Sequence, residues 1–81
     1  MVFNERTLPN ALRREHSTKP SVWGLVRVFK GELWLRFDDG REQLLNAGKA
    51  AVVGPQEVHW VEPLGELQMQ VEFYDRRPFA E

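Results

Sequence analysis

The sequence predicts a small all-β protein, a barrel or sandwich with at most one short helical turn near its N-terminus. Short segments rich in Val, Leu and aromatic residues recur along the chain and are separated by Gly, Pro and Asn-containing turns. Several of these segments alternate apolar and polar residues, which is the period of a strand with one buried face. Together these patterns predict six or seven short strands, in keeping with the barrel and sandwich classes.

The N-terminal part predicts a short edge strand around Val2-Phe3, followed by a single helical turn from Pro9 to Arg14. Proline is favoured in the first turn of a helix, because its missing N–H would have no partner there. Leu8 and Leu12 are four residues apart, and we expect them to cap one end of the core.

The segment from Val22 to Phe29 is almost entirely apolar and predicts a central strand buried on both faces. Gly24 inside it indicates a bulge or a close approach of another group to the backbone. Lys30-Gly31 is expected to turn the chain into a second apolar strand, Glu32 to Phe37.

A hairpin is predicted around Asp39-Gly40, a dipeptide that suits a two-residue type I′ turn. This turn pairs Leu35 with Leu44 and Trp34 with Leu45. The predicted inner face therefore carries Leu44, and Leu45 lies with Trp34 on the outer face, where a second subunit would cover them.

The C-terminal half predicts a short buried strand from Ala50 to Val53 and another from His59 that stops at Pro63. The segment from Leu67 to Tyr74 alternates, with four apolar residues on one face and four polar or aromatic residues on the other. The expected outcome is one domain over residues 1–81, with a core from about residue 8 to residue 75.

Composition excludes several classes of function. The 81 residues carry a net charge of −1 without long blocks of one sign, which argues against nucleic acid or anionic lipid as a partner. The absence of cysteine excludes disulfides and thiolate chemistry and fits a cytoplasmic protein. Neither a signal peptide nor a membrane-spanning segment is expected. Because a chain of this size buries a small core, we expect a homodimer.

The two histidines, His16 and His59, are the groups that titrate near neutral pH, and each lies at the junction of a loop and an apolar strand. Imidazole binds Zn, Ni, Fe or Cu, and a carboxylate such as Glu62 could complete the site if a bulge turned it to the same face. Alternatively, the histidines are hydrogen-bonded structural residues, and Glu62 pairs with an arginine outside.

Arg27 is a charged residue inside an apolar strand and therefore needs a partner. An ion pair with Glu72 or Glu62 is one interpretation, and an anion clamp is the other. Glu72 and Gln70 form a polar stripe that either faces solvent or lines a pocket.

Two stretches of the chain resemble the cupin-like domain of the tellurite-resistance protein B type. The first runs from Leu8-Pro9 through His16, Thr18-Lys19 and Val22-Trp23-Gly24 to Leu33. The second contains Gly54-Pro55, His59, Val61-Glu62 and Val71 to Tyr74. The resemblance implies a small cupin jelly-roll barrel, dimeric and linked to stress from toxic oxyanions. The methyltransferase that follows this domain in the two-part tellurite protein is not expected in this chain.

Metal-dependent cupins carry two histidine-rich motifs, and this sequence matches them only in part. His16 lies near the first histidine position and His59 near the later one, whereas Gly24 occupies the position of the glutamate. Two of the four ligands of that pattern are therefore retained, fewer than the three or four protein ligands usual at zinc sites.

The sequence leaves three functions open. The first is a protein that binds a small molecule, an oxyanion or a divalent transition metal, with His16, His59, Arg27, Glu72 and Trp23 as ligand contacts and Lys19 as a further cation. The second is a metal-dependent cupin enzyme, a dioxygenase or isomerase. The third is a non-catalytic structural or regulatory module whose histidines only stabilise the fold.

Overall fold

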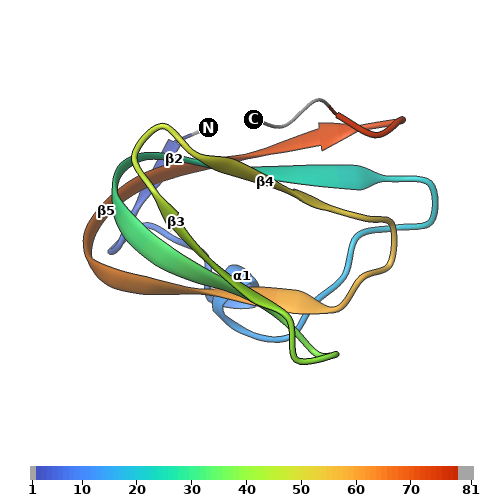
Figure 1. Cartoon of the computed structure of the whole chain (residues 1–81), viewed down its shortest axis with the longest axis horizontal. Coiled ribbons are helices and arrows are strands. Elements are labelled where there is room, and N and C mark those ends of the chain that lie inside the picture. The colour runs from blue at the N-terminus through green and yellow to red at the C-terminus, as the bar shows by residue number, and fades with distance from the viewer. Residues whose placement is uncertain (1, 79–81) are drawn as a thin grey trace.

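The computed structural model describes residues 2–78 and consists of β-strands with one helical turn (Figure 1). The elements, in chain order, are β1 (Val2–Asn4), α1 (Asn10–Arg13), β2 (Trp23–Phe37), β3 (Glu42–Asn46), β4 (Ala50–Val53) and β5 (His59–Tyr74). This confirms the all-β class, the N-terminal edge strand, the single helical turn and the strand at Ala50–Val53. The described part of the chain holds no helix with the length and hydropathy needed to cross a membrane.

The strands form one antiparallel sheet in which β2 and β5 pair along most of their length. β1 adds to β5, β3 pairs with the second half of β2, and β4 pairs with its first half. Within residues 2–78 the sheet does not close on itself, because β1 and β3 end the hydrogen-bonded order. The strand pairing of residues 2–78 therefore describes an open sheet and not a closed barrel.

β2 and β5 bend sharply at the same level, which the sequence did not predict. The pairing of the two strands shifts between Val28 and Lys30 and again between Gly31 and Leu33. The expected turn at Lys30-Gly31 is therefore wrong, because β2 continues through it. The expected end of a strand at Pro63 is also wrong: Pro63 pairs with Leu33 beside the bulge, where a missing N–H is tolerated.

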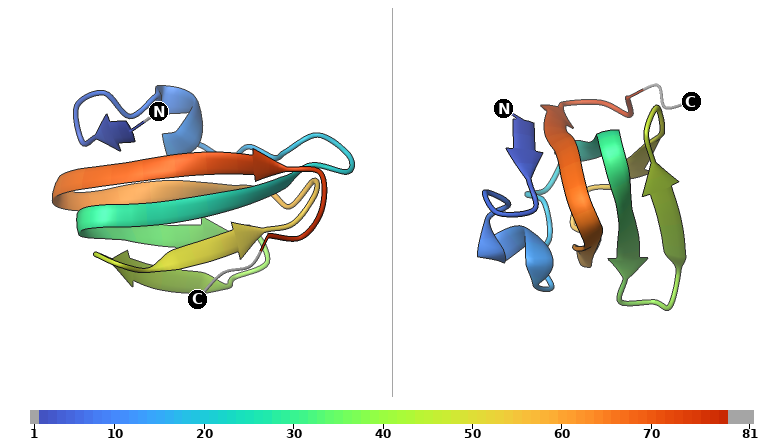
Figure 2. Two further views of the ribbon diagram at one scale, coloured as in Figure 1. Left: turned by 90° about the horizontal axis from the view of Figure 1, so that it is seen from above. Right: turned by 90° about the vertical axis from the view of Figure 1, so that its left-hand side faces the viewer.

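Gly31 makes this bend possible. Its φ is +81°, and a Cβ atom at this position would lie 1.9 Å from the carbonyl oxygen of Glu66. Only glycine combines a positive φ with such a close approach of two backbones. The long strands therefore fold over at Gly31. The view from above shows both strands doubling back at the same end of the molecule (Figure 2, left).

The bend brings the two halves of the sheet face to face, and the core lies between them. One half contributes Val26, Val28 and Met69, and the other contributes Leu33, Leu35 and Leu45, all at most 3% exposed. The chain before β2 covers one side of this core: Leu8 is buried, and Leu12 on α1 packs against the cluster. The expected capping by Leu8 and Leu12 is confirmed.

The β2–β3 hairpin has a register different from the predicted one. Phe37 N–H donates to Arg41 C=O at 2.9 Å, and Gly40 N–H donates to Phe37 C=O at 3.1 Å. This is a three-residue loop with Gly40 at a φ of +94°, and it adds one residue to the expected two-residue turn. Leu45 therefore pairs with Leu33 and is fully buried, whereas Leu44 pairs with Trp34 and is 38% exposed. The shift by one residue exchanges the faces of the two leucines.

Candidate functional site

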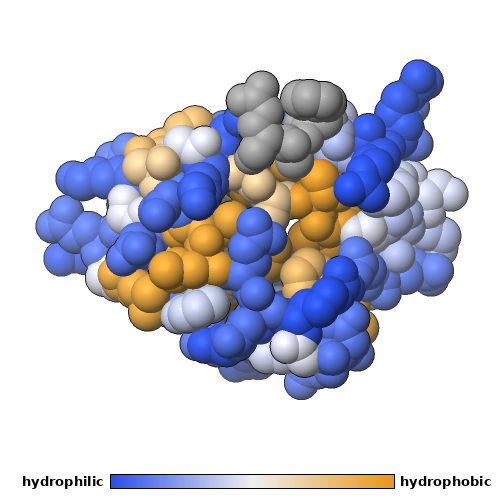
Figure 3. Space-filling model, viewed as in Figure 1, coloured by the Kyte–Doolittle hydropathy of each residue, from blue (hydrophilic) through white to orange (hydrophobic). Residues whose placement is uncertain are grey.

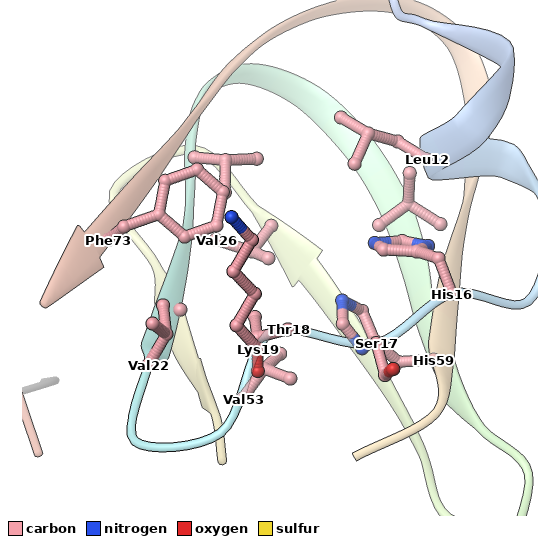
Figure 4. Close-up of a pocket in the computed structure, with 13 residues that line it drawn as sticks. Leu12, His16, Ser17, Thr18, Lys19, Val22, Val26, Val53, His59 and Phe73 are labelled. Carbon is pink, nitrogen blue, oxygen red and sulfur yellow. The ribbon is translucent and has the colours of Figure 1, made fainter. Parts of the chain in front are cut away.

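A pocket of about 340 Å³ opens between the two halves of the sheet, at the end opposite the bend. Its walls are mainly apolar and come from β2, β4 and β5, and its rim comes from the segment before β2 (Figure 4). Hydrophilic side chains surround apolar residues in the middle of one face of the molecule (Figure 3). The lining residues are Leu12, His16, Ser17, Thr18, Lys19, Val22, Gly24, Val26, Val53, His59, Val61, Val71 and Phe73.

The fold brings the two histidines together on one wall of this pocket (Figure 4). His16 and His59 exchange both backbone hydrogen bonds, at 3.0 and 2.9 Å, as the two residues of an antiparallel bridge. Side chains of such a directly opposed pair emerge on the same face of a sheet. Accordingly, the centroids of the two imidazole rings are 4.1 Å apart, with the ring planes inclined by 56°.

Each ring is oriented by a carbonyl group two residues before it in the chain. His16 Nδ1 lies 2.9 Å from Arg14 C=O, and His59 Nδ1 lies 2.7 Å from Glu57 C=O. Because a carbonyl oxygen can only accept, each Nδ1 carries a hydrogen, and in the neutral ring Nε2 is the basic nitrogen. The two rings thus offer two Nε2 lone pairs at the pocket.

Burial sets the charge of the second histidine. His59 is 5% exposed, and this burial, reinforced by the neighbouring His16, lowers the pKa of His59 below its ordinary value of 6.5. The hydrogen bond to Glu57 C=O opposes this shift of the pKa without reversing it. His59 is therefore a neutral imidazole at pH 7.

Thr18 holds the rim of the pocket to the loop after β4. Its hydroxyl donates to Gly54 C=O at 3.2 Å and accepts from Gln56 N–H at 3.1 Å. Its methyl group faces Gly24, where an added Cβ would lie 3.8 Å from it. Gly24 lines the pocket in a regular stretch of β2, with its neighbours at ordinary van der Waals distance, so neither the expected bulge nor an unusually close approach is present.

Arg27 and Glu72 lie on the outer face of the sheet and not among the lining residues. Arg27 Nε is 2.9 Å from Glu72 Oε2, so the ion-pair interpretation is confirmed. This hydrogen bond, with help from Tyr74 and Gln70, lowers the pKa of Glu72 from 4.5 to about 2. The polar stripe of Gln70 and Glu72 thus stabilises the outer face and does not reach the pocket.

Glu62 and Trp23 also lie outside the pocket. The side chain of Glu62 is 3.1 Å from Arg36 Nε, at ion-pair distance but without the geometry of a hydrogen bond, and it accepts from Trp60 Nε1. The expected pairing with an external arginine is confirmed. The Trp23 ring lies under Arg77, whose guanidinium carbon is 5.6 Å from the ring centroid.

Within residues 2–78, no three or more side chains of His, Cys, Asp or Glu are grouped closely enough to hold a metal ion. The sequence identified the two histidines but not the apolar walls between which they lie. The alternation of Leu67 to Tyr74 was the available signal, since Val71 and Phe73 on its apolar face line the pocket.

Comparison with known proteins gives a family and related structures. The model of the family described as the TehB-like domain matches residues 1–71. The crystal structure of TehB from Haemophilus influenzae is similar, with a TM-score of 0.82 and 29% identity over 90% of this chain. The chain spans only 28% of the length of that TehB chain. Curated proteins give no match.

Two further crystal structures share the fold. A protein from Escherichia coli K12 has a TM-score of 0.78 at 22% identity, over 90% of this chain and 82% of its own. A protein from Neisseria meningitidis has a TM-score of 0.63 at 15% identity, over 89% of this chain and 67% of its own. These identities are low enough that the likeness concerns the fold alone.

Proposed function

Because this chain belongs to the TehB-like domain family, we propose that it is a cupin-type domain that binds a small molecule in the pocket between the two halves of its sheet. The observation that carries this proposal is an open, mainly apolar pocket with two imidazoles on one wall. Small-molecule sites are typically apolar clefts of about 300–1,000 Å³ with a few polar groups. The pocket fits this description.

The charges around the pocket favour this proposal over a site for a free oxyanion. Arg27 is paired with Glu72 on the outer face, which leaves Lys19 as the cationic side chain on the described rim. Recognition of an oxyanion usually needs several cationic or N–H donors. We therefore propose a small organic molecule, and not tellurite or a similar oxyanion, as the ligand.

Toluene tests the proposal, because it is apolar and small enough for the pocket. The methyl NMR signals of Val26, Val53 and Val61 should shift saturably as toluene is added. The Phe73→Ala variant should weaken this binding severalfold, because Phe73 lines the pocket while being 64% exposed, so its loss spares the core. Leu64→Ala is the matched control, since Leu64 is 49% exposed at the bend. Unsaturable or absent shifts would refute a binding pocket.

A transition-metal site is the second candidate, and the paired Nε2 atoms of His16 and His59 favour it. These two ligands fit half of a zinc, nickel, iron or copper site, and solvent or a bound molecule would have to complete it. A metal held there would act as a Lewis acid, while the carbonyls at each Nδ1 would fix the ring orientation. The dioxygenase or isomerase alternative needs the same metal.

Elemental analysis of untagged protein and of the His16→Ala/His59→Ala double variant tests the metal. About one equivalent per chain that is lost in the variant supports it. If neither metal content nor ligand binding depends on these histidines, the result supports the third function, a structural or regulatory module, over the two binding functions.

We also propose that the chain forms a homodimer. Trp34 and Leu44 form an apolar cross-strand pair on the outer face of β2 and β3, with Arg36 over the Trp34 ring at 5.0 Å. A second subunit would bury this pair. Sedimentation equilibrium tests the proposal, and Leu44→Lys should shift the protein toward the monomer if this face is used.

A further inference from the structure

The two imidazoles present the pocket with a pair of acceptors, because the carbonyls of Arg14 and Glu57 fix the hydrogen of each ring on Nδ1. Two neutral rings of this tautomer cannot hydrogen-bond to each other through Nε2. The hydrogen bonds of both rings within residues 2–78 are made at Nδ1. Both Nε2 atoms are therefore left for a group in the pocket.

A partly buried acceptor gains a donor whenever one is within reach, because an unpaired polar group in an apolar site is costly. The neighbouring hydroxyl of Thr18 does not serve, since it already donates to Gly54 C=O. Lys19 is exposed on the rim. The Ser17 hydroxyl also lines the pocket, but within residues 2–78 it makes no hydrogen bond to either ring. A ligand that enters the apolar part of the pocket would thus find two acceptors on the wall that no neighbouring side chain already occupies.

Charge narrows the choice of ligand further. The lining residues include no carboxylate, so a cationic ligand would be buried without a counter-charge. An anionic ligand would place its oxygens against two nitrogen lone pairs, and a single exposed lysine would have to offset this repulsion. A neutral donor meets neither penalty.

We infer that the ligand of this pocket is a neutral, mainly apolar molecule with a hydroxyl or N–H donor that binds to the Nε2 atoms of His16 and His59. Simple phenols are the smallest members of this class. Their ring would pack against Val26, Val61 and Phe73. Their single O–H hydrogen would be donated to one of the two Nε2 atoms or shared between both. This inference rests on the proposed binding function and adds the chemical class of the ligand.

Four probes of similar size separate the possibilities: phenol, its methyl ether anisole, toluene and benzoate. Binding is measured by methyl NMR titration at pH 8. Phenol should bind about fivefold or more tightly than anisole, which has no donor, since a neutral hydrogen bond contributes about 1 kcal/mol. Benzoate should bind more weakly than phenol.

Variants that keep an aromatic ring but remove Nε2 complete the test. In His16→Phe and in His59→Phe, the preference for phenol over anisole should fall below the wild-type value. It should fall toward one when both substitutions are combined, while anisole binding persists. His16 is half-buried, so His16→Phe keeps the test valid if the variant of the buried His59 does not fold. Trp60→Phe, on the opposite face of β5, is the control and should retain the wild-type preference.

Each other outcome overturns the inference in a recognisable way. Equal affinities for phenol and anisole would show that the imidazoles do not anchor the ligand, although the pocket binds. Tighter binding of benzoate that is lost in Lys19→Met would show an anion site at the rim. Failure of all four probes, toluene included, would refute the proposed function itself.

Discussion

Replacing Gly31 by alanine should destabilise the protein far more than replacing Gly40, although both glycines have a positive φ. At Gly40, with φ +94°, no atom lies within 4 Å of an added Cβ, so the cost is the backbone conformation alone, about 1–2 kcal/mol. At Gly31 the added Cβ would lie 1.9 Å from Glu66 C=O, where real Cβ contacts essentially never fall below 3.0 Å. The two strands must then separate by about 1 Å.

Separating the two strands lowers the free energy of unfolding in two ways. It weakens the pairing of Gly31 with Leu67 and displaces the Leu67 side chain, which is 1% exposed. One or two lost hydrogen bonds contribute about 1 kcal/mol each, and partial loss of packing of a buried leucine contributes about 2 kcal/mol. With the conformational cost, Gly31→Ala should lose about 4–6 kcal/mol. A domain of 81 residues has a total stability of about 4–12 kcal/mol.

Thermal and urea denaturation, followed by tryptophan fluorescence and circular dichroism, measure the stability of both variants. Gly40→Ala should remain fully folded, with a midpoint temperature lower by about 5–15 °C. Gly31→Ala should be largely unfolded or melt more than about 20 °C below the wild type. Equal destabilisation of the two variants would refute the proposed close approach of β2 and β5 at the bend.

Three further sets of substitutions test the register, the rim and the outer face. Leu45→Ala should lower the free energy of unfolding, measured by urea denaturation, by about 2–5 kcal/mol, and Leu44→Ala should lower it by less than about 1 kcal/mol. The reverse order would support the two-residue turn instead. Thr18→Val should lower the free energy of unfolding by about 1–2 kcal/mol, because it removes the two hydrogen bonds of the hydroxyl. Thr18→Ser should retain most of this stability, and equal stability of the two variants would contradict the role of the hydroxyl. The hydrogen bond from Arg27 lowers the pKa of Glu72 to about 2. The Glu72 carboxylate therefore stabilises the fold above pH 4.5, and this stabilisation is lost as the pH falls from 4.5 to about 2. Because the pair is partly exposed, the loss should be about 1 kcal/mol, and Glu72→Gln should remove this part of the acid dependence.

Local patterns in the sequence predicted the elements of this fold well and their lengths poorly. The alternation of Leu67 to Tyr74 and the short strand from Ala50 to Val53 depend on neighbouring residues, and the structure confirms both strands. Gly31 and Pro63, in contrast, look like strand ends in the sequence, because the same residue types serve turns and bulges. Their role became visible only when the backbones of β2 and β5 were placed side by side.

The site shows the same division between local and long-range information. His16 and His59 stood out by residue type, but their bridge joins positions 43 residues apart, which no local pattern specifies. The assignment of Glu62 depended on the face of the strand, and the period of two correctly indicated that Glu62 and His59 diverge. The turn at Asp39-Gly40 failed for a different reason, since this dipeptide suits both two-residue and three-residue hairpins.

The bend and the pocket lie at opposite ends of the β2–β5 pair, and this separation matters for testing function. At the bend, a single methyl group is incompatible with the backbone of Glu66. At the pocket, Phe73 is largely exposed, His16 is half-buried, and the rim is joined to the sheet mainly by the His16–His59 bridge and the Thr18 hydroxyl. Substitutions at the accessible pocket residues Phe73 and His16 should therefore change binding while the bend keeps the fold, so a loss of ligand affinity there can be assigned to the site itself.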